Sequence, residues 1–385
     1  MKFIEQYKLK AKLKQCFRRA ELCYKSNMGD RVVYAYPRIH SMKTNDSFTE
    51  IVFSLLVGLD PSIMKKKAYV FAQQFGKGIE MEGDLKNFTL VIYKKEFKEQ
   101  YNYDYKEIYP HVEKLKLGVI AGKNRHNEYV AFDLTKQPHI LIAGETGSGK
   151  STQIRSVITT MVLTKKPSEL IFYLADCKKS EFHIFRKLEH VQCVESQPKK
   201  IEAMLKKIKK ELDERSDLTE MFEVAHADDL PPEHKRPYIV LCIDEFVMLR
   251  DNEKIMETLI EVVAIGRTLG IFAILSMQRP SAKILDTTVR ANLTVSMGFK
   301  LRDRIEATIV NTPGAQDLDL TGHFIMNSDQ LHELQAPYLD LEKAKELLSP
   351  FYVMKNPTKD ITPKHTPKQE ENPDLKYIDL FDNKD

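Results

Sequence analysis

The 385-residue chain lacks the features of membrane-spanning, secreted and disulfide-rich proteins. No apolar run approaches the length of about 18 residues that a bilayer-spanning helix needs. The first residues contain no apolar segment of the kind found in secretory signals. The five cysteines are odd in number and contain no Cys-x-x-Cys pair, which argues against a disulfide framework and a structural zinc site. We therefore expect a cytoplasmic protein with reduced thiols.

The chain also has no large excess of basic over acidic residues. The chain has 59 basic and 55 acidic residues and a formal net charge of +4. Any surface for nucleic acid must therefore come from local clustering of basic residues rather than from the overall charge. The chain is long enough for two or three domains and for a core without covalent staples.

The composition changes along the chain and predicts four parts. Residues 1–28 are expected to form a basic amphipathic helix, either packed through one face or lying on an anionic membrane or on DNA. Residues 30–112 mix short strand-like runs with a helical segment, which indicates a small α/β module. Residues 113–352 alternate apolar strands with helices, which predicts an α/β fold with a mainly parallel sheet covered on both faces. Residues 353–385 contain four prolines and many charges and are expected to be a disordered tail.

The strongest motif covers residues 144–151, with the sequence Gly-Glu-Thr-Gly-Ser-Gly-Lys-Ser. It follows an apolar run and precedes a helical pattern, which is the context of a phosphate-binding loop. Its glycines let backbone N–H groups curl around phosphates, and the helix N-terminus adds its positive dipole end. Lys150 is expected to reach the β- and γ-phosphates, and Ser151 to bind Mg²⁺. The predicted nucleotide-binding residues are Gly144, Glu145, Thr146, Gly147, Ser148, Gly149, Lys150, Ser151 and Thr152.

A second element is a buried apolar strand, residues 239–243, that ends in two carboxylates. Active sites of open parallel sheets lie at the carboxyl ends of strands. Asp244 is expected to hold Mg²⁺ through water, and Glu245 to act as the general base for the attacking water. Two surface carboxylates at a strand end are the alternative interpretation.

A third element is the apolar strand at residues 271–277, which is followed by a glutamine. Gln278 is expected to sense the γ-phosphate or to orient the attacking water. The preceding helix ends near Arg267, which is either a finger supplied to a neighbouring subunit's nucleotide or a basic residue that complements the helix dipole.

Four ordered blocks resemble the motor domain of the FtsK/SpoIIIE family of DNA translocases. They are residues 117–152, 173–182, 239–246 and 266–281. The resemblance implies a RecA-like ATPase core, a homohexameric ring, ATP and Mg²⁺ as cofactors, and ATP-driven movement along double-stranded DNA. The expected membrane helices and the DNA-reading winged helix of FtsK are not found, which favours the conjugative coupling proteins of mobile elements.

That branch implies a relaxase and a membrane transfer-channel protein as further partners, with recruitment to the inner face of the membrane by a partner. A DNA segregation or packaging motor and a secretion-type ATPase acting on proteins remain alternatives. Small-molecule kinases and GTPases are disfavoured because no Asn-Lys-x-Asp follows the loop, and ABC transporters because no Leu-Ser-Gly-Gly-Gln-like segment occurs. DNA contacts are expected in loops at residues 178–187 and 281–290, through phosphates.

Overall fold

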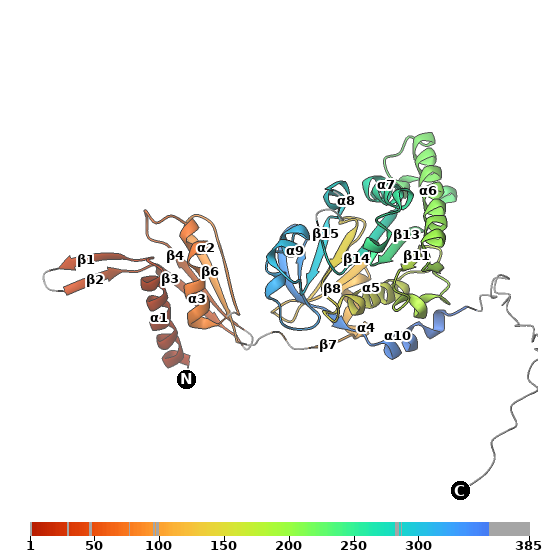
Figure 1. Ribbon diagram of the computed structural model, residues 1–385. Helices are drawn as coiled ribbons and strands as arrows, with labels where there is room; N and C mark the ends of the chain where they lie inside the picture. The colour runs from red at the N-terminus through yellow and green to blue at the C-terminus, as the bar shows by residue number, and fades with distance from the viewer. Residues whose placement is uncertain are drawn as a thin grey trace, which may run out of the picture.

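The computed structural model describes residues 2–28, 31–45, 48–76, 78–94, 97, 100–281, 285 and 287–353. The expected tail at 353–385 lies outside these residues except for Val353, and so does part of the 281–290 loop. The described part forms two layered units, one up to residue 94 and one from residue 100 onward (Figure 1).

The smaller unit is a four-stranded antiparallel sheet with helices packed on it and a projecting hairpin (Figure 1). Its sheet has the strand order β3-β4-β6-β5, and the hairpin pairs β1 with β2. The strands are β1 Tyr24–Met28, β2 Arg31–Ala35, β3 Arg38–Thr44, β4 Phe48–Ser54, β5 Ile79–Gly83 and β6 Asn87–Tyr93. The helices are α1 Lys2–Arg19, α2 Ser62–Lys66 and α3 Ala68–Phe75.

The N-terminal helix is shorter than predicted. It ends at Arg19 instead of continuing to residue 28, because Glu21 adopts a left-handed backbone with φ 61° and Leu22 donates its N–H to the Phe17 carbonyl. The chain then turns into the β1–β2 hairpin. Leu13 and Phe17 are fully buried, and the Phe17 ring lies 5.0 Å from that of Phe53 on β4. The apolar face of the helix is therefore packed into the module's own core.

The smaller unit contacts the larger one through aromatic and charged side chains. The hydroxyl of Tyr93, at the end of β6, lies 3.1 Å from Nε2 of His126. The guanidinium of Arg125 lies 5.5 Å from the ring centre of Tyr93, and the ring of Phe48 on β4 lies 4.7 Å from that of His126. These contacts tie the small module to the β8–β9 loop of the larger unit.

The larger unit contains a ten-stranded mixed sheet with the order β12-β11-β13-β14-β10-β15-β16-β17-β8-β9. The strands from β12 to β15 pair in parallel, and those from β15 to β9 pair antiparallel. The strands are β8 Gly118–Lys123, β9 Tyr129–Asp133, β10 Ile140–Ala143, β11 Leu170–Asp176, β12 Val191–Glu195, β13 Tyr238–Asp244, β14 Ile271–Met277, β15 Val295–Phe299, β16 His323–Asn327 and β17 Leu331–Gln335. A separate parallel pair joins β7 Tyr101–Asn102 to β18 Pro337–Tyr338.

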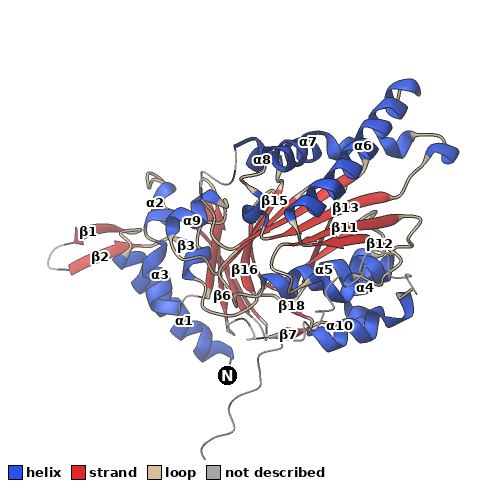
Figure 2. Cartoon of the chain, turned by 45° about the vertical axis from the view of Figure 1, so that its right-hand side comes forward, coloured by secondary structure: helices blue, strands red, loops and turns tan. Residues whose placement is uncertain are grey.

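Helices cover both faces of this sheet (Figure 2), because successive residues of its central strands point to opposite sides. On β10, for example, Ile140 and Ile142 enter one core, with residues of α4, α5 and α10, and Leu141 and Ala143 enter the other, with residues of α6 and α7. The helices are α4 Tyr105–Val112, α5 Lys150–Thr164, α6 Pro198–Met221, α7 Glu253–Leu269, α8 Thr287–Asn292, α9 Arg304–Ile309 and α10 Leu341–Leu348. Short 3₁₀ turns are η1 Phe182–Phe185, η2 Ala227–Asp229, η3 Pro232–His234, η4 Phe246–Leu249, η5 Ala315–Asp317 and η6 Ser349–Phe351.

The structure confirms the predicted α/β class and differs in two details. Four strands on one side of the sheet are antiparallel, which apolar strand–helix alternation could not indicate. In addition, Tyr103, Ile108 and Val112 belong to the core of the large sheet. The small module therefore ends before residue 103 rather than at residue 112. No helix in the described residues combines the length and the apolar character that crossing a bilayer requires.

We predict that Phe17→Ala lowers the stability of the small module by about 3–5 kcal/mol, because it removes a fully buried ring that contacts Phe53 and Phe71. The denaturant dependence of hydrogen exchange in β4 and β6 measures this change. Tyr7→Ala on the same helix is the control, because the Tyr7 side chain is 77% exposed. Equal effects of the two substitutions would contradict the packing of α1 described above.

Candidate nucleotide site

Three neighbouring parallel strands bring the predicted site residues to one edge of the sheet. The order β13-β14-β10 places the carboxyl ends of these strands side by side. The acidic pair follows β13, Gln278 follows β14, and the loop 144–149 follows β10. The Thr146 hydroxyl donates a hydrogen bond of 3.2 Å to Oε1 of Gln278, which directly links the loop to the neighbouring strand end.

The loop needs glycine because neighbouring chain segments approach it closely. Gly149 has φ 111°, and a Cβ there would lie 2.8 Å from the backbone N of Gly322. Gly144 has φ 155°, and its Cβ would lie 2.7 Å from the Cβ of Phe299 on β15. Gly322 also donates its N–H to the Ser148 carbonyl at 2.8 Å. The loop is thus held between β15 and the turn before β16.

Lys150 begins α5 and is only 7% exposed. Its ammonium group donates hydrogen bonds to the carbonyls of Gly144 and Glu145 within the loop. Burial lowers the pKa of Lys150 from its ordinary value to about 8, because few polar groups replace its hydration, although Glu245 and Asp244 oppose the shift. A buried cation at the start of a helix is a site prepared for an anion.

A cavity of 340 Å³ lies over the loop. It is lined by Glu145, Thr146, Gly147, Gly149, Lys150, Ser151, Thr152, Lys178, Ser180, Glu181, Asp244, Gln278 and Thr321. Nine of these residues were predicted from the sequence. Gly144 and Ser148 shape the loop behind them, and two predicted residues, Glu245 and Arg267, are not part of this lining.

The two carboxylates after β13 have different environments. Asp244 lines the cavity and is 6% exposed, and burial raises its pKa because the charged carboxylate is poorly solvated there. Glu245 has a left-handed backbone with φ 53°. Its Oε2 forms an ion pair of 2.7 Å with Lys178, and its Oε1 accepts the backbone N–H of Gln278 at 3.1 Å. Both oxygens of Glu245 are therefore fixed by partners beside the cavity.

A turn after β11 brings three further residues, Lys178, Ser180 and Glu181, to the cavity. The Asp176 carboxylate, at the end of β11, accepts N–H groups from Ser180, Glu181 and Phe182 at 3.0–3.1 Å. This turn directs Lys178, the first residue of the predicted DNA-contacting loop 178–187, toward the cavity and Glu245. The sequence signals for this arrangement are an acidic residue at a strand end followed by polar residues, and the family resemblance of residues 173–182.

Arg267 lies at the opposite edge of the sheet. It is in the last turn of α7, directly before β14 begins, whereas Gln278 follows the end of β14. The seven-residue strand between them spans about 20 Å. The exposed Arg267 side chain therefore does not serve the cavity of its own chain.

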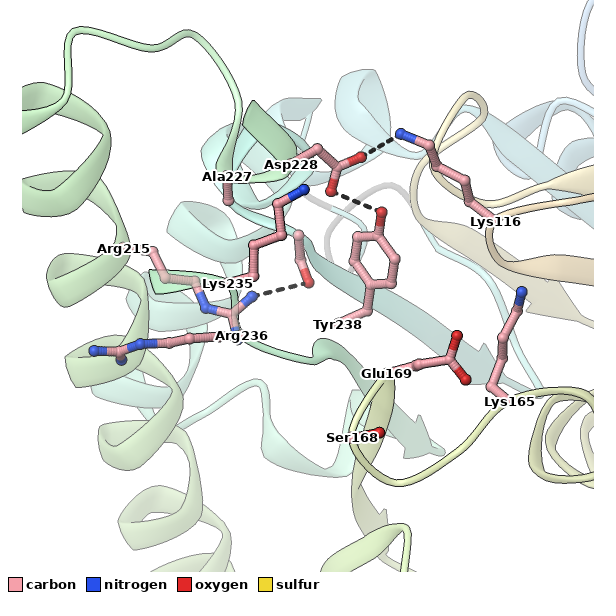
Figure 3. Close-up of a pocket in the computed structure, with 11 residues that line it drawn as sticks. Lys116, Lys165, Ser168, Glu169, Arg215, Ala227, Asp228, Lys235, Arg236 and Tyr238 are labelled. Atoms are coloured by element: carbon pink, nitrogen blue, oxygen red, sulfur yellow. Dashed lines mark hydrogen bonds and ion pairs between the residues drawn. The ribbon is translucent and has the colours of Figure 1, made fainter. Parts of the chain in front are cut away.

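A second cavity, of 370 Å³, opens at that opposite edge (Figure 3). Its lining contains five basic residues, four of which have hydrogen-bond or ion-pair partners within the chain. Lys116 pairs with Asp228, Arg215 donates to the carbonyls of Leu269 and Pro237, and Arg236 pairs with Glu211 and Glu214. These contacts join the start of β13 to α6 and α7, so the basic residues stabilise the fold there.

Comparisons with known proteins agree with the motifs. The sequence model of the FtsK/SpoIIIE family matches residues 104–235. The DNA translocase FtsK of Chlorobaculum tepidum is 28% identical over 256 residues, which cover 60% of this chain and 32% of that protein. The DNA translocase SpoIIIE of Bacillus subtilis is 28% identical over 219 residues, 53% of this chain and 28% of the relative. The chain thus spans about a third of the length of these relatives.

Solved structures share the fold. The pCW3 conjugation coupling protein TcpA, in a monomer form with ATPγS, has a TM-score of 0.60 at 22% identity, covering 82% of this chain and 94% of that chain. EssC (ATPases 2 and 3) from Geobacillus thermodenitrificans has a TM-score of 0.60 at 20% identity, covering 67% and 52%. The predicted resemblance to the FtsK/SpoIIIE family is confirmed over residues 104–235, which the family's sequence model matches.

Proposed function

We propose that this protein is an ATP-driven double-stranded DNA translocase that acts as a coupling protein in the conjugative transfer of a mobile element. The observation that carries the proposal is the cavity in which the phosphate-binding loop, Asp244 and Gln278 converge at the carboxyl edge of the sheet. The choice of DNA as substrate is supported by relatives that are named as DNA translocases. The conjugative role is supported by the shared fold with TcpA over most of both chains.

The residues present fit ATP and Mg²⁺. The positive-φ glycines allow the curled backbone that a phosphate-binding loop needs, and Lys150 supplies a buried cation. The Ser151 hydroxyl and the Asp244 carboxylate would hold Mg²⁺, which supplies charge neutralisation at the phosphates. A divalent cation would also stabilise the charged form of Asp244, which burial disfavours.

Different protein residues have different roles in the proposed hydrolysis. Lys150 moves from its loop carbonyls to the phosphates, and Gln278 orients the attacking water next to Thr146. Glu245 accepts a proton from that water, with its carboxylate held in position by Lys178 and the Gln278 amide. Arg267, at the opposite edge, would act toward the nucleotide of a neighbouring subunit in a homohexameric ring.

Further partners follow from the proposed role. Double-stranded DNA would pass through the ring, a relaxase would accompany the transferred strand, and a membrane transfer-channel protein would recruit the motor from the cytoplasm to the inner face of the membrane. The shared fold with the type VII secretion ATPase EccC of Thermomonospora curvata, with a TM-score of 0.55 at 22% identity, favours a secretion-type ATPase acting on proteins as the second candidate. A DNA segregation or packaging motor would use the same site with another cargo.

Translocation separates these candidates. We expect the protein to displace a third strand from a triplex on linear duplex DNA when ATP is present, because movement along the duplex strips the bound strand. Triplex displacement measured by fluorescence checks this. Absence of displacement under conditions where ATP is hydrolysed would count against a DNA motor and in favour of a protein substrate.

We predict that Glu245→Gln binds ATP but hydrolyses it about 10²–10⁴-fold more slowly, because the amide accepts the same N–H yet cannot take a proton. Single-turnover hydrolysis and equilibrium nucleotide binding measure the two effects. Glu257→Gln, the same chemical change at an exposed position on α7, should behave as the wild type. Turnover by Glu245→Gln within a few-fold of wild type would show that another residue activates the water.

We predict that nucleotide affinity falls as the pH rises above about 8. The pKa of Lys150 is lowered to about 8 by burial, and bound phosphates favour its charged form, so binding below pH 8 needs no proton uptake. Above that value the affinity should drop by up to about tenfold per pH unit, with proton uptake on binding. Calorimetry in buffers of different ionisation enthalpy measures both. An affinity that stays flat to pH 9.5 would contradict the role of Lys150.

A further inference from the structure

The N-terminal helix α1 exposes a strongly basic face. Its apolar side is buried in the module's core through Leu13, Cys16 and Phe17. The remaining surface carries six exposed basic side chains, which we call the α1 basic face: Lys8, Lys10, Lys12, Lys14, Arg18 and Arg19. The motor site described above uses none of them.

The lysine-rich helix α6 shows what a merely solvated basic helix looks like in this protein. On α6, Lys206 pairs with Glu202, Lys209 with Asp213, and Lys210 with Glu214, each four residues apart. Three of the six lysines of α6 are thus paired with a carboxylate one helical turn away. Among the described residues, no member of the α1 basic face forms an ion pair, so its charge is directed outward.

The basic residues of α1 form two rows. At 3.6 residues per turn, Lys10, Lys14 and Arg18 follow one flank of the helix, with successive members about 6 Å apart along the axis. Lys8, Lys12 and Arg19 follow the other flank. The two rows are separated by about 140° around the axis. The ridge between them carries Tyr7, Ala11 and Gln15, all exposed.

One row is supported by the polypeptide around the hairpin. The Arg18 guanidinium lies 5.7 Å from the ring centre of Tyr34 on β2, and the Lys14 ammonium lies 5.6 Å from that of Tyr36. These contacts reduce the freedom of two long side chains before any partner binds. Both views place α1 at the end of the molecule away from α6 and α7 (Figures 1 and 2), so the motor domain does not cover it.

We propose that α1 lies in the major groove of double-stranded nucleic acid, with its two basic rows contacting the phosphates of the two strands. The major groove is about 12 Å wide and admits an α-helix of about 10–12 Å diameter. Cations on both flanks then meet the two backbones, and the ridge of small and polar side chains faces the base edges. The contacts are mainly to phosphates and therefore largely independent of sequence.

This geometry favours a duplex over an anionic membrane. A helix that binds a membrane inserts an apolar face between the lipids, but Leu13 and Phe17 are committed to the protein core. The side of α1 that a membrane would meet carries Tyr7, Ala11 and Gln15 on its ridge, so a single aromatic side chain would supply the apolar area for insertion. A flat anionic surface also gives no reason for two rows on opposite flanks.

The test measures binding of the full chain to a short DNA duplex by fluorescence anisotropy, without nucleotide, over a series of salt concentrations. Two double variants each neutralise two of the three cations of one row: Lys8→Gln with Lys12→Gln, and Lys10→Gln with Lys14→Gln. Each should reduce the slope of log K against log salt by about 1.8, since each lost phosphate contact removes about 0.9. The same counterion arithmetic gives a loss of affinity of roughly 60-fold at about 0.1 M salt.

The matched control is Lys199→Gln with Lys207→Gln, which makes the same charge change at exposed positions of α6 that form no ion pair among the described residues. The proposal is overturned if the control loses as much affinity as the row variants, if only one row matters, or if single-stranded DNA of equal length binds as tightly. Row-dependent sedimentation with anionic vesicles and unchanged DNA affinity would instead assign the face to a membrane. Because no nucleotide is present, these outcomes are independent of whether the cavity hydrolyses ATP.

Discussion

The close packing of the loop at residues 144–149 against its neighbours is the constraint on which the candidate site depends. A side chain at Gly149 would collide with Gly322, and one at Gly144 with Phe299. Glycine at both positions therefore lets β15 and the turn before β16 pack directly against the loop. The antiparallel side of the sheet, which carries no predicted catalytic residue, thus contributes a wall of the nucleotide cavity through Thr321.

The sequence revealed those parts of the site that are local in the chain. The glycine pattern of residues 144–151, the carboxylates after 239–243 and the glutamine after 271–277 each follow an apolar strand directly, so a motif and a strand end were enough to find them. Lys178 and Thr321 could not be assigned in this way. The turn after β11 is held by backbone N–H groups that donate to the Asp176 carboxylate, and it directs Lys178 toward Glu245. Thr321 reaches the cavity because of the strand order, which depends on pairing between residues far apart in the chain.

The same limit applies to the fold. Apolar runs separated by helices predicted the parallel strands and the α/β class, because buried parallel strands have that pattern. Strands β16, β17, β8 and β9 are antiparallel, and their pairing depends on contacts between residues as distant as Lys123 and Gln335. For α1, composition predicted the cationic helix, but only the packing of Phe17 shows which side faces solvent and where the cations lie relative to each other.

The central claim is that nucleotide hydrolysis at this cavity is coupled to duplex DNA. The most direct measurement is ATP hydrolysis by the purified full chain, with and without linear double-stranded DNA, over a series of salt concentrations. The account predicts strong stimulation by DNA that fades as salt rises, because the contacts with phosphates are electrostatic. Hydrolysis that proceeds at the same rate with and without DNA at every salt concentration would contradict it.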